Sequence, residues 1–203
     1  MSFFRRLMIP LLLLCLFCSC SKNPGIDLPQ TMPPIEICFS PHGGCTEAVV
    51  REINAAKTSI LVQAYSFTSA PIAKALVEAH KRGVHVEVIL DESQETEEYS
   101  SADFLLHAGV PTMIDAEHAI AHNKVMIVDA AVVITGSFNF TSSAESRNAE
   151  NLLVIRDPQI AEKYATNWKN HIAHSTEYTG HKSQSERALS SHPGGKTSGH
   201  AKQ

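Results

Sequence analysis

Hydrophobic and polar residues follow two different periods along the middle of the chain. Short runs of continuous or alternating apolar residues are typical of strands, and longer stretches with apolar residues three and four apart predict amphipathic helices. Strands are predicted at residues 35–39, 59–65, 84–90, 112–114, 125–128, 132–135 and 151–155. Helices are predicted at residues 46–56, 71–82, 102–107 and 158–174. This alternation predicts one α/β domain over residues 35–178, a mixed β-sheet sandwiched by helices.

The two ends of the chain differ from this region. Residues 1–20 hold two arginines followed by an apolar run of about a dozen residues, short of the roughly 20 that span a bilayer. They predict an export signal, with an uncleaved anchor as the alternative. Residues 21–34 contain four prolines and predict a linker. Residues 179–203 are rich in Ser, Gly, His and Lys, which predicts a disordered tail.

Three of the five cysteines lie in the predicted signal. Cys20 follows a small residue, Ser19, and this pair resembles a bacterial lipoprotein processing site, with Cys20 as the lipidated residue. Ordinary cleavage is the alternative. Either way the expected location is outside the cytoplasm, in the periplasm or anchored to a membrane.

The other two cysteines, Cys38 and Cys45, flank a turn-rich loop. In an oxidising compartment such a pair predicts a disulfide. It would stabilise the fold by about 2–3 kcal/mol on the chain-entropy model. Two free thiols, or a metal site completed by His42, are the alternatives.

The net charge of the chain does not by itself favour one class of binding partner. With 17 basic and 21 acidic residues, the net charge of −4 gives no general attraction to nucleic acid or to an anionic membrane. Residues 91–98 hold five acids. If this run lies near the active face it repels a polyanion; the alternative is a solvated loop that points away.

The residues that suggest chemistry lie between positions 122 and 139. His122 and Lys124 are two apart on entering a strand, so their side chains are expected on the same side. Imidazole can act as nucleophile or general base, and a nearby ammonium stabilises charge on phosphate oxygens. Ser137 and Asn139 repeat the spacing after the next strand and offer hydroxyl and amide donors, while Gly136 allows close backbone approach.

This segment resembles the signature of the phospholipase D superfamily: His-x-Lys, four residues, Asp, six residues, Gly-Ser-x-Asn. The resemblance extends from Cys38 to Asn151, and this extent resembles the small single-motif branch, which includes bacterial plasmid-type endonucleases and mitochondrial cardiolipin hydrolases. It implies that His122 attacks phosphorus and forms a phosphohistidine. Lys124 and Asn139, assisted by Ser137, are implied to hold the non-bridging oxygens.

The resemblance also implies supporting roles and a partner. Glu150 is implied to orient the imidazole of His122, while Asp129 and Gly136 are implied to be structural residues near the site. The reaction needs two histidines, and this chain has one motif, so a homodimer with a shared active site is expected.

No metal or cofactor is implied. The expected function is a metal-independent phosphodiesterase, first an endonuclease on DNA or RNA, with a phospholipase D acting on cardiolipin or phosphatidylcholine as the alternative. A non-catalytic adaptor is the remote alternative.

Overall fold

A computed structural model describes residues 34–181 of the 203-residue chain. These residues form one α/β domain, as predicted. The predicted export signal, its candidate lipidation residue Cys20, the linker up to residue 33 and the tail from residue 182 onward lie outside the described residues. In the described part, no helix combines the length and the apolar character needed to cross a bilayer.

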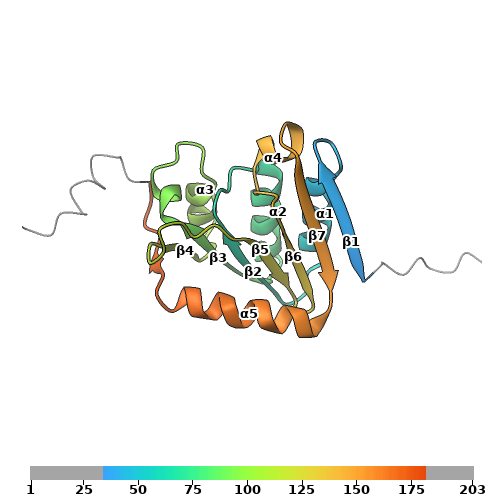
Figure 1. The fold of residues 1–203 in the computed structure, drawn as a ribbon. Helices are drawn as coiled ribbons and strands as arrows, with labels where there is room; N and C mark the ends of the chain where they lie inside the picture. The colour runs from blue at the N-terminus through green and yellow to red at the C-terminus, as the bar shows by residue number, and fades with distance from the viewer. Residues whose placement is uncertain (1–33, 182–203) are drawn as a thin grey trace, which may run out of the picture. The chain divides into compact units, whose positions relative to one another are not determined.

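The sheet has eight strands in the order β1-β7-β6-β5-β2-β3-β4-β8 (Figure 1). Neighbouring strands run parallel from β2 to β4 and antiparallel elsewhere, so the sheet is mixed. The strands are β1 (Ile35–Ser40), β2 (Ser59–Ala64), β3 (His85–Asp91), β4 (Thr112–Asp115), β5 (Lys124–Val128), β6 (Val132–Gly136), β7 (Glu150–Arg156) and β8 (Thr176–Glu177).

Helices cover both faces of the sheet, and α5 lies on the face opposite α1 and α2 (Figure 1). The apolar side of α5 packs through Ala161 and Trp168. The indole N–H of Trp168 donates a 2.9 Å hydrogen bond to the carbonyl oxygen of Val62, which satisfies a polar group that burial would otherwise leave unpaired. The helices are α1 (Cys45–Ala55), α2 (Ala70–Lys81), α3 (Ala102–His107), α4 (Ser142–Ser146) and α5 (Pro158–Ile172), with a 3₁₀ turn η1 (Glu92–Glu95).

The predicted strands and long helices appear within one or two residues of their predicted bounds. Three short elements, η1, α4 and β8, have no signal in the hydrophobic pattern. They are held by side-chain caps and by neighbouring strands: the hydroxyl of Thr141 accepts from the N–H of Ala144 at the start of α4, and β8 pairs with β4. Such short elements cannot show a period in the sequence.

The predicted disulfide is not present in this structure, in which Cys38 and Cys45 are free cysteines. The two thiols are hydrogen-bond neighbours. Burial raises the pKa of the Cys45 thiol to about 12, so this thiol stays protonated, and the thiolate is the form that reacts. Within residues 34–181 the two cysteines do not form a metal-ligand group with His42.

Asp129 fixes the turn between β5 and β6 to the loop before β2. Its carboxylate accepts hydrogen bonds from the backbone N–H groups of Lys57, Thr58 and Ser59, at 2.7–3.1 Å, and from the hydroxyl of Thr58 at 2.8 Å. Burial alone raises the pKa of this carboxyl, but these donors outweigh it, and the pKa lies below its usual value.

We expect Asp129→Ala to lower the free energy of unfolding by about 2–3 kcal/mol at neutral pH, because hydrogen bonds to a charged group are lost. A depressed folded-state pKa gives stability above the unfolded pKa of about 3.9, and this stability is lost as the pH falls through the folded value. Urea titrations should therefore show that the difference in unfolding free energy between the wild type and Asp129→Ala becomes smaller at acid pH. The exposed Glu162→Ala is the control, with an expected change within about 0.5 kcal/mol. A difference independent of pH would contradict this account.

Candidate active site

Ends of several strands meet at one edge of the sheet, and the predicted catalytic residues lie on them. Ala64, the last residue of β2, pairs with Lys124, the first of β5. Ser40, the last residue of β1, pairs with Glu150, the first of β7. Gly136 ends β6 between these two pairs. Antiparallel pairing therefore brings together residues that are far apart in the sequence.

The ring of Tyr65 lies against both His122 and Lys124. The Tyr65 and His122 ring centroids are 4.5 Å apart, with an interplanar angle of 53°. The ammonium nitrogen of Lys124 lies 5.1 Å from the Tyr65 centroid, within range of a cation–π interaction, and donates a 2.8 Å hydrogen bond to the carbonyl oxygen of His122. The backbone N–H of Tyr65 donates to the carbonyl of Asn123 at 2.9 Å. The ring of Tyr65 therefore contacts both the exposed imidazole of His122 and the ammonium of Lys124.

Lys124 is buried, with only 7% of its surface exposed, although it ends in a charge. Burial lowers the pKa of its ammonium, while the negative charges of Glu150 and Asp91 raise it; burial is the larger effect, and the pKa lies below its usual value. The charge sits where water is largely excluded, and its attraction for an anion is stronger there than in bulk water.

Hydrogen bonds hold Glu150 in place at the start of β7. One carboxylate oxygen accepts a 2.6 Å hydrogen bond from the hydroxyl of Ser137, and the other accepts from the side-chain amide of Asn148 at 3.1 Å. The backbone N–H of Glu150 donates to the hydroxyl of Ser40 at 3.2 Å. Among the described residues the imidazole of His122 does not donate the expected hydrogen bond to Glu150, whose carboxylate instead accepts from Ser137 and Asn148.

The Gly-Ser-x-Asn turn is fixed on β7. The N–H groups of Ser137 and Phe138 both donate to the carbonyl oxygen of Asn151, at 3.1 and 3.2 Å. Gly136 has a positive φ, and a Cβ added there would lie 2.2 Å from the same oxygen, so only glycine fits. The side-chain oxygen of Asn139 is buried and has no hydrogen-bond partner among the described residues. The turn therefore holds a buried amide oxygen that is left unpaired within residues 34–181.

Asp91 supports the segment that leads into His122. One of its carboxylate oxygens accepts from the N–H of Ala121 at 2.7 Å, and the other accepts from the N–H of Ser93 at 3.0 Å. Asp91 and Glu95 are buried, whereas the acids at positions 97 and 98 are exposed. The acidic run is therefore neither a uniform charged surface nor a loop that points away from the site.

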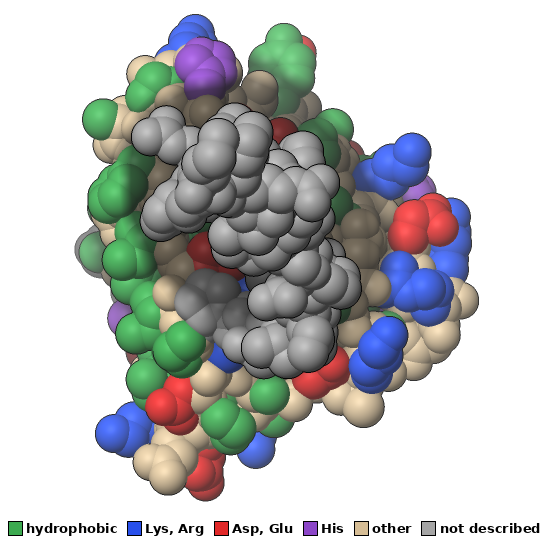
Figure 2. Space-filling model, turned by 90° about the vertical axis from the view of Figure 1, so that its right-hand side faces the viewer, with side chains coloured by type: hydrophobic (Ala, Val, Ile, Leu, Met, Phe, Trp, Pro, Cys, Tyr) green, Lys and Arg blue, Asp and Glu red, His purple; other side chains and the backbone are tan. Residues whose placement is uncertain are grey.

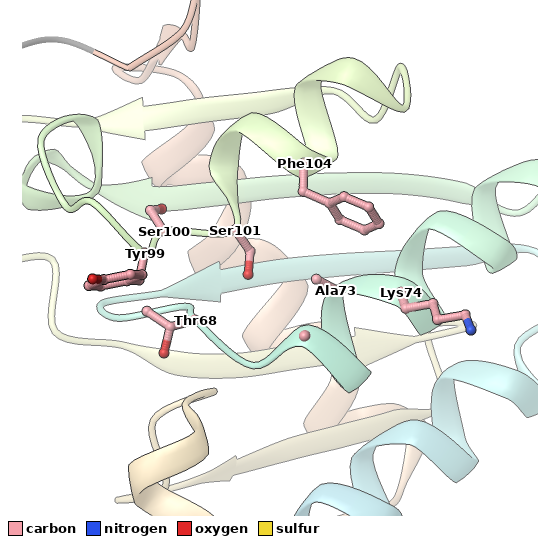
Figure 3. Close-up of a pocket in the computed structure, with 8 residues that line it drawn as sticks. Thr68, Ala73, Lys74, Tyr99, Ser100, Ser101 and Phe104 are labelled. Atoms are coloured by element: carbon pink, nitrogen blue, oxygen red, sulfur yellow. The ribbon is translucent and has the colours of Figure 1, made fainter.

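A pocket of about 400 Å³ opens beside the start of α2 (Figure 3). The backbone N–H of Thr68, on its rim, donates to the carbonyl of Phe140, the residue after Asn139. In Figure 3 the rings of Tyr99 and Phe104 stand on the α3 side of the pocket and Lys74 extends away at one end. The pocket is lined by Thr68, Ala70, Ala73, Lys74, Tyr99, Ser100, Ser101 and Phe104.

The surface near the site is partly apolar. The alternate residues Ile35, Ile37 and Phe39 of β1 are more than half exposed, and Phe39 immediately precedes Ser40 at the site. Figure 2, which views the β1 side of the domain, shows hydrophobic side chains in a column along one edge. On the opposite side of that view several basic side chains lie near one another, with acidic ones among them.

Asp129 does not lie near the site. It directly follows the last residue of β5, whereas Lys124 is the first residue of the same strand. Asp129 is therefore a structural residue that lies away from the catalytic residues. Conversely, Tyr65 and Asp91 belong to the site although the motif assigns them no role. Each lies at or directly after the end of a predicted buried strand, which is the available sequence signal.

Comparisons with known proteins agree with this geometry. The family model described as "Cardiolipin synthase, PLD-like domain" matches residues 49–172. The chain is 45% identical over 139 residues to a phospholipase D of Rickettsia conorii, covering 68% of this chain and 70% of the relative. It is 32% identical over 139 residues to the human mitochondrial cardiolipin hydrolase, covering 68% of this chain and 55% of that protein.

A solved structure supports the same assignment. Nuc from Salmonella typhimurium, described as a phospholipase D family member, superimposes with a TM-score of 0.69 at 41% sequence identity. The match covers 72% of this chain and 99% of that one. With its strand-end site built on His122 and Lys124, the chain belongs to the phospholipase D superfamily of phosphodiesterases.

Proposed function

We propose that the protein hydrolyses phosphodiesters through a covalent phosphohistidine on His122. The observation that carries this proposal is the exposed imidazole of His122 held on Tyr65 beside the buried ammonium of Lys124. The Ser137 hydroxyl and the Asn139 amide supply polar groups from the next strand end.

In the first step, a ring nitrogen of His122 attacks phosphorus and the bond to the leaving alcohol breaks. The leaving oxygen takes a proton from a second histidine on the opposite side of phosphorus. That histidine then removes a proton from water, which attacks the phosphohistidine and releases the phosphate product and the free imidazole of His122. Lys124 stabilises the charge on the non-bridging oxygens throughout.

The second histidine is supplied by a second copy of the chain in a two-fold dimer. A two-fold axis beside the site places His122 of one subunit opposite the partner subunit's His122. The exposed side chain of His122 and the exposed apolar residues of β1 that end beside the site at Phe39 support this arrangement.

The chemistry needs no metal ion at this site. The ammonium of Lys124 and an imidazolium supply the positive charge that Mg²⁺ supplies in other phosphoryl-transfer enzymes.

Replacing His122 with alanine removes the nucleophile and should lower the rate by at least about 1,000-fold. The exposed His85→Ala variant should keep the wild-type rate. When wild-type reactions are quenched without acid, mass spectrometry should find a peptide containing His122 that carries the phosphoryl group together with its remaining ester substituent. A His122→Ala enzyme of undiminished activity would exclude the mechanism.

Mixing subunits tests the shared site. When wild-type and His122→Ala chains are unfolded together in equal amounts and refolded, a shared site leaves activity only in wild-type homodimers. Activity should fall to roughly one quarter of that of an all-wild-type sample, against about one half for independent sites. The one-half result would argue for a self-sufficient subunit.

For the substrate we propose a phospholipid, with nucleic acid as the second candidate. The curated relatives are named phospholipase D and mitochondrial cardiolipin hydrolase. Acidic residues outnumber basic ones within residues 34–181, and a nucleic acid carries many phosphates that would meet this surface, whereas a lipid headgroup carries one or two. The exposed ring of Tyr99 favours the second candidate, because it could stack on a base.

The deciding experiment gives one enzyme preparation three substrates in parallel. These are vesicles of phosphatidylcholine with and without cardiolipin, plasmid DNA, and single-stranded RNA, each with His122→Ala as the control. Release of headgroup or phosphatidic acid, dependent on His122, supports the lipid. Cleavage confined to DNA or RNA overturns that choice but leaves the proposed chemistry intact.

A further inference from the structure

Away from the catalytic histidine, four side chains form a histidine–aspartate cluster: Asp115, His118, His171 and His174. Each offers one ligand atom, and these atoms all lie within 4.8 Å of one another. Asp115 ends β4, His118 lies in the loop that follows it, and the other two histidines lie at the end of α5 and just beyond it. Two segments that are far apart in the sequence, residues 115–118 and 171–174, thus converge on one point.

The distances in this cluster suit a four-coordinate metal ion. The carboxylate of Asp115 lies 3.3 Å from His118 Nδ1, 2.7 Å from His171 Nδ1 and 3.3 Å from His174 Nε2. In a tetrahedral zinc site with bonds of about 2.0–2.1 Å to nitrogen and oxygen, neighbouring ligand atoms are about 3.3 Å apart. The two separations of 3.3 Å, both to Oδ1 of Asp115, match this value, and the 2.7 Å separation is to the other carboxylate oxygen, Oδ2.

The buried negative charge of Asp115 also favours a cation at this cluster. Asp115 is fully buried, at 0% exposed, and burying an ionised carboxylate is costly unless positive charge accompanies it. Its ion-pair partners among the described residues are the three histidines, which carry charge only when protonated. The three imidazole rings lie 4.9–5.4 Å apart, so protonating all of them would set like charges against each other. A divalent cation supplies the charge while the imidazoles stay neutral.

We propose that Asp115, His118, His171 and His174 bind one Zn²⁺ ion as a structural site. Imidazole and carboxylate are normal zinc ligands, and four protein ligands without an open position are the mark of a structural rather than a catalytic site. The sequence carries the matching pattern: Asp115 and His118 are three apart, as are His171 and His174.

The proposed ion clamps the segment that leads to the catalytic histidine. Between His118 and His122 the chain is held on its other side by Asp91, which accepts from the N–H of Ala121. Asp91 and Asp115 are paired neighbours on the parallel strands β3 and β4. The ion joins this segment and the end of α5 to the sheet. It is separate from the cation of Lys124, because β2 and β3 lie between β4 and β5 in the sheet.

Zinc content tests the proposal directly. The full chain is purified without an affinity tag, because tag histidines bind zinc, then incubated with Zn²⁺, desalted and analysed by inductively coupled plasma mass spectrometry. We expect about one zinc ion per wild-type chain and at least a fivefold loss in His171→Ala/His174→Ala. His85→Ala and the C-terminal variant His181→Ala/His192→Ala/His200→Ala should bind as the wild type does.

Two further measurements separate the site from the fold and from the reaction. The melting temperature of the wild type should rise with added Zn²⁺ and fall with a chelator, while that of the double variant should respond to neither. His122→Ala should bind zinc normally, since it touches none of the ligands. If the double variant does not fold, Co²⁺ titration of the wild type decides, because four-coordinate Co²⁺ absorbs strongly in the visible range.

The proposal is overturned if the wild type retains no more zinc than the double variant, or if bound Co²⁺ shows only the weak absorption of six-coordinate Co²⁺. The cluster is then a metal-free hydrogen-bond network centred on Asp115. A fall in hydrolysis with chelator that is matched by a fall in melting temperature would support the clamp, and it would not indicate a metal-dependent reaction at His122.

Discussion

A charged ammonium held in a buried position is the constraint around which the active site is arranged. The cation of Lys124 must be partly desolvated to act strongly on a phosphate, yet burial disfavours its charged form. Carboxylates at Glu150 and Asp91, the face of the Tyr65 ring and the carbonyl of His122 all surround it and oppose that cost. Each comes from a different strand end, so the charge can be kept only where those ends meet.

Backbone hydrogen bonds also fix the loops at this edge of the sheet. Asn151 receives two N–H groups of the Gly-Ser-x-Asn turn, and Asn123 receives the N–H of Tyr65. The loops that carry the side chains are thereby fixed by main-chain contacts that do not depend on the side chains themselves. A site held this way can expose His122 and Ser137 to solvent while keeping them in place.

The segment between β4 and β5 has a double role. It carries His122, and it is also held near its ends by two carboxylates on neighbouring parallel strands, Asp91 and Asp115. Asp91 contributes to the electrostatics of Lys124, whereas Asp115 faces three histidines and belongs to a separate cluster. Stability of this short loop therefore bears directly on the position of the imidazole.

The sequence by itself determined the α/β class, the bounds of the long elements and the identity of the residues around His122 and Lys124, because hydrophobic period and motif spacing are local properties. The tertiary structure alone decided the sheet order, which brings Tyr65 and Asp91 into the site. It also decided the partners of Glu150, and it brought Asp115 next to His171, far away along the chain. Such contacts depend on which strands pair and which helix packs where, and no local pattern encodes that.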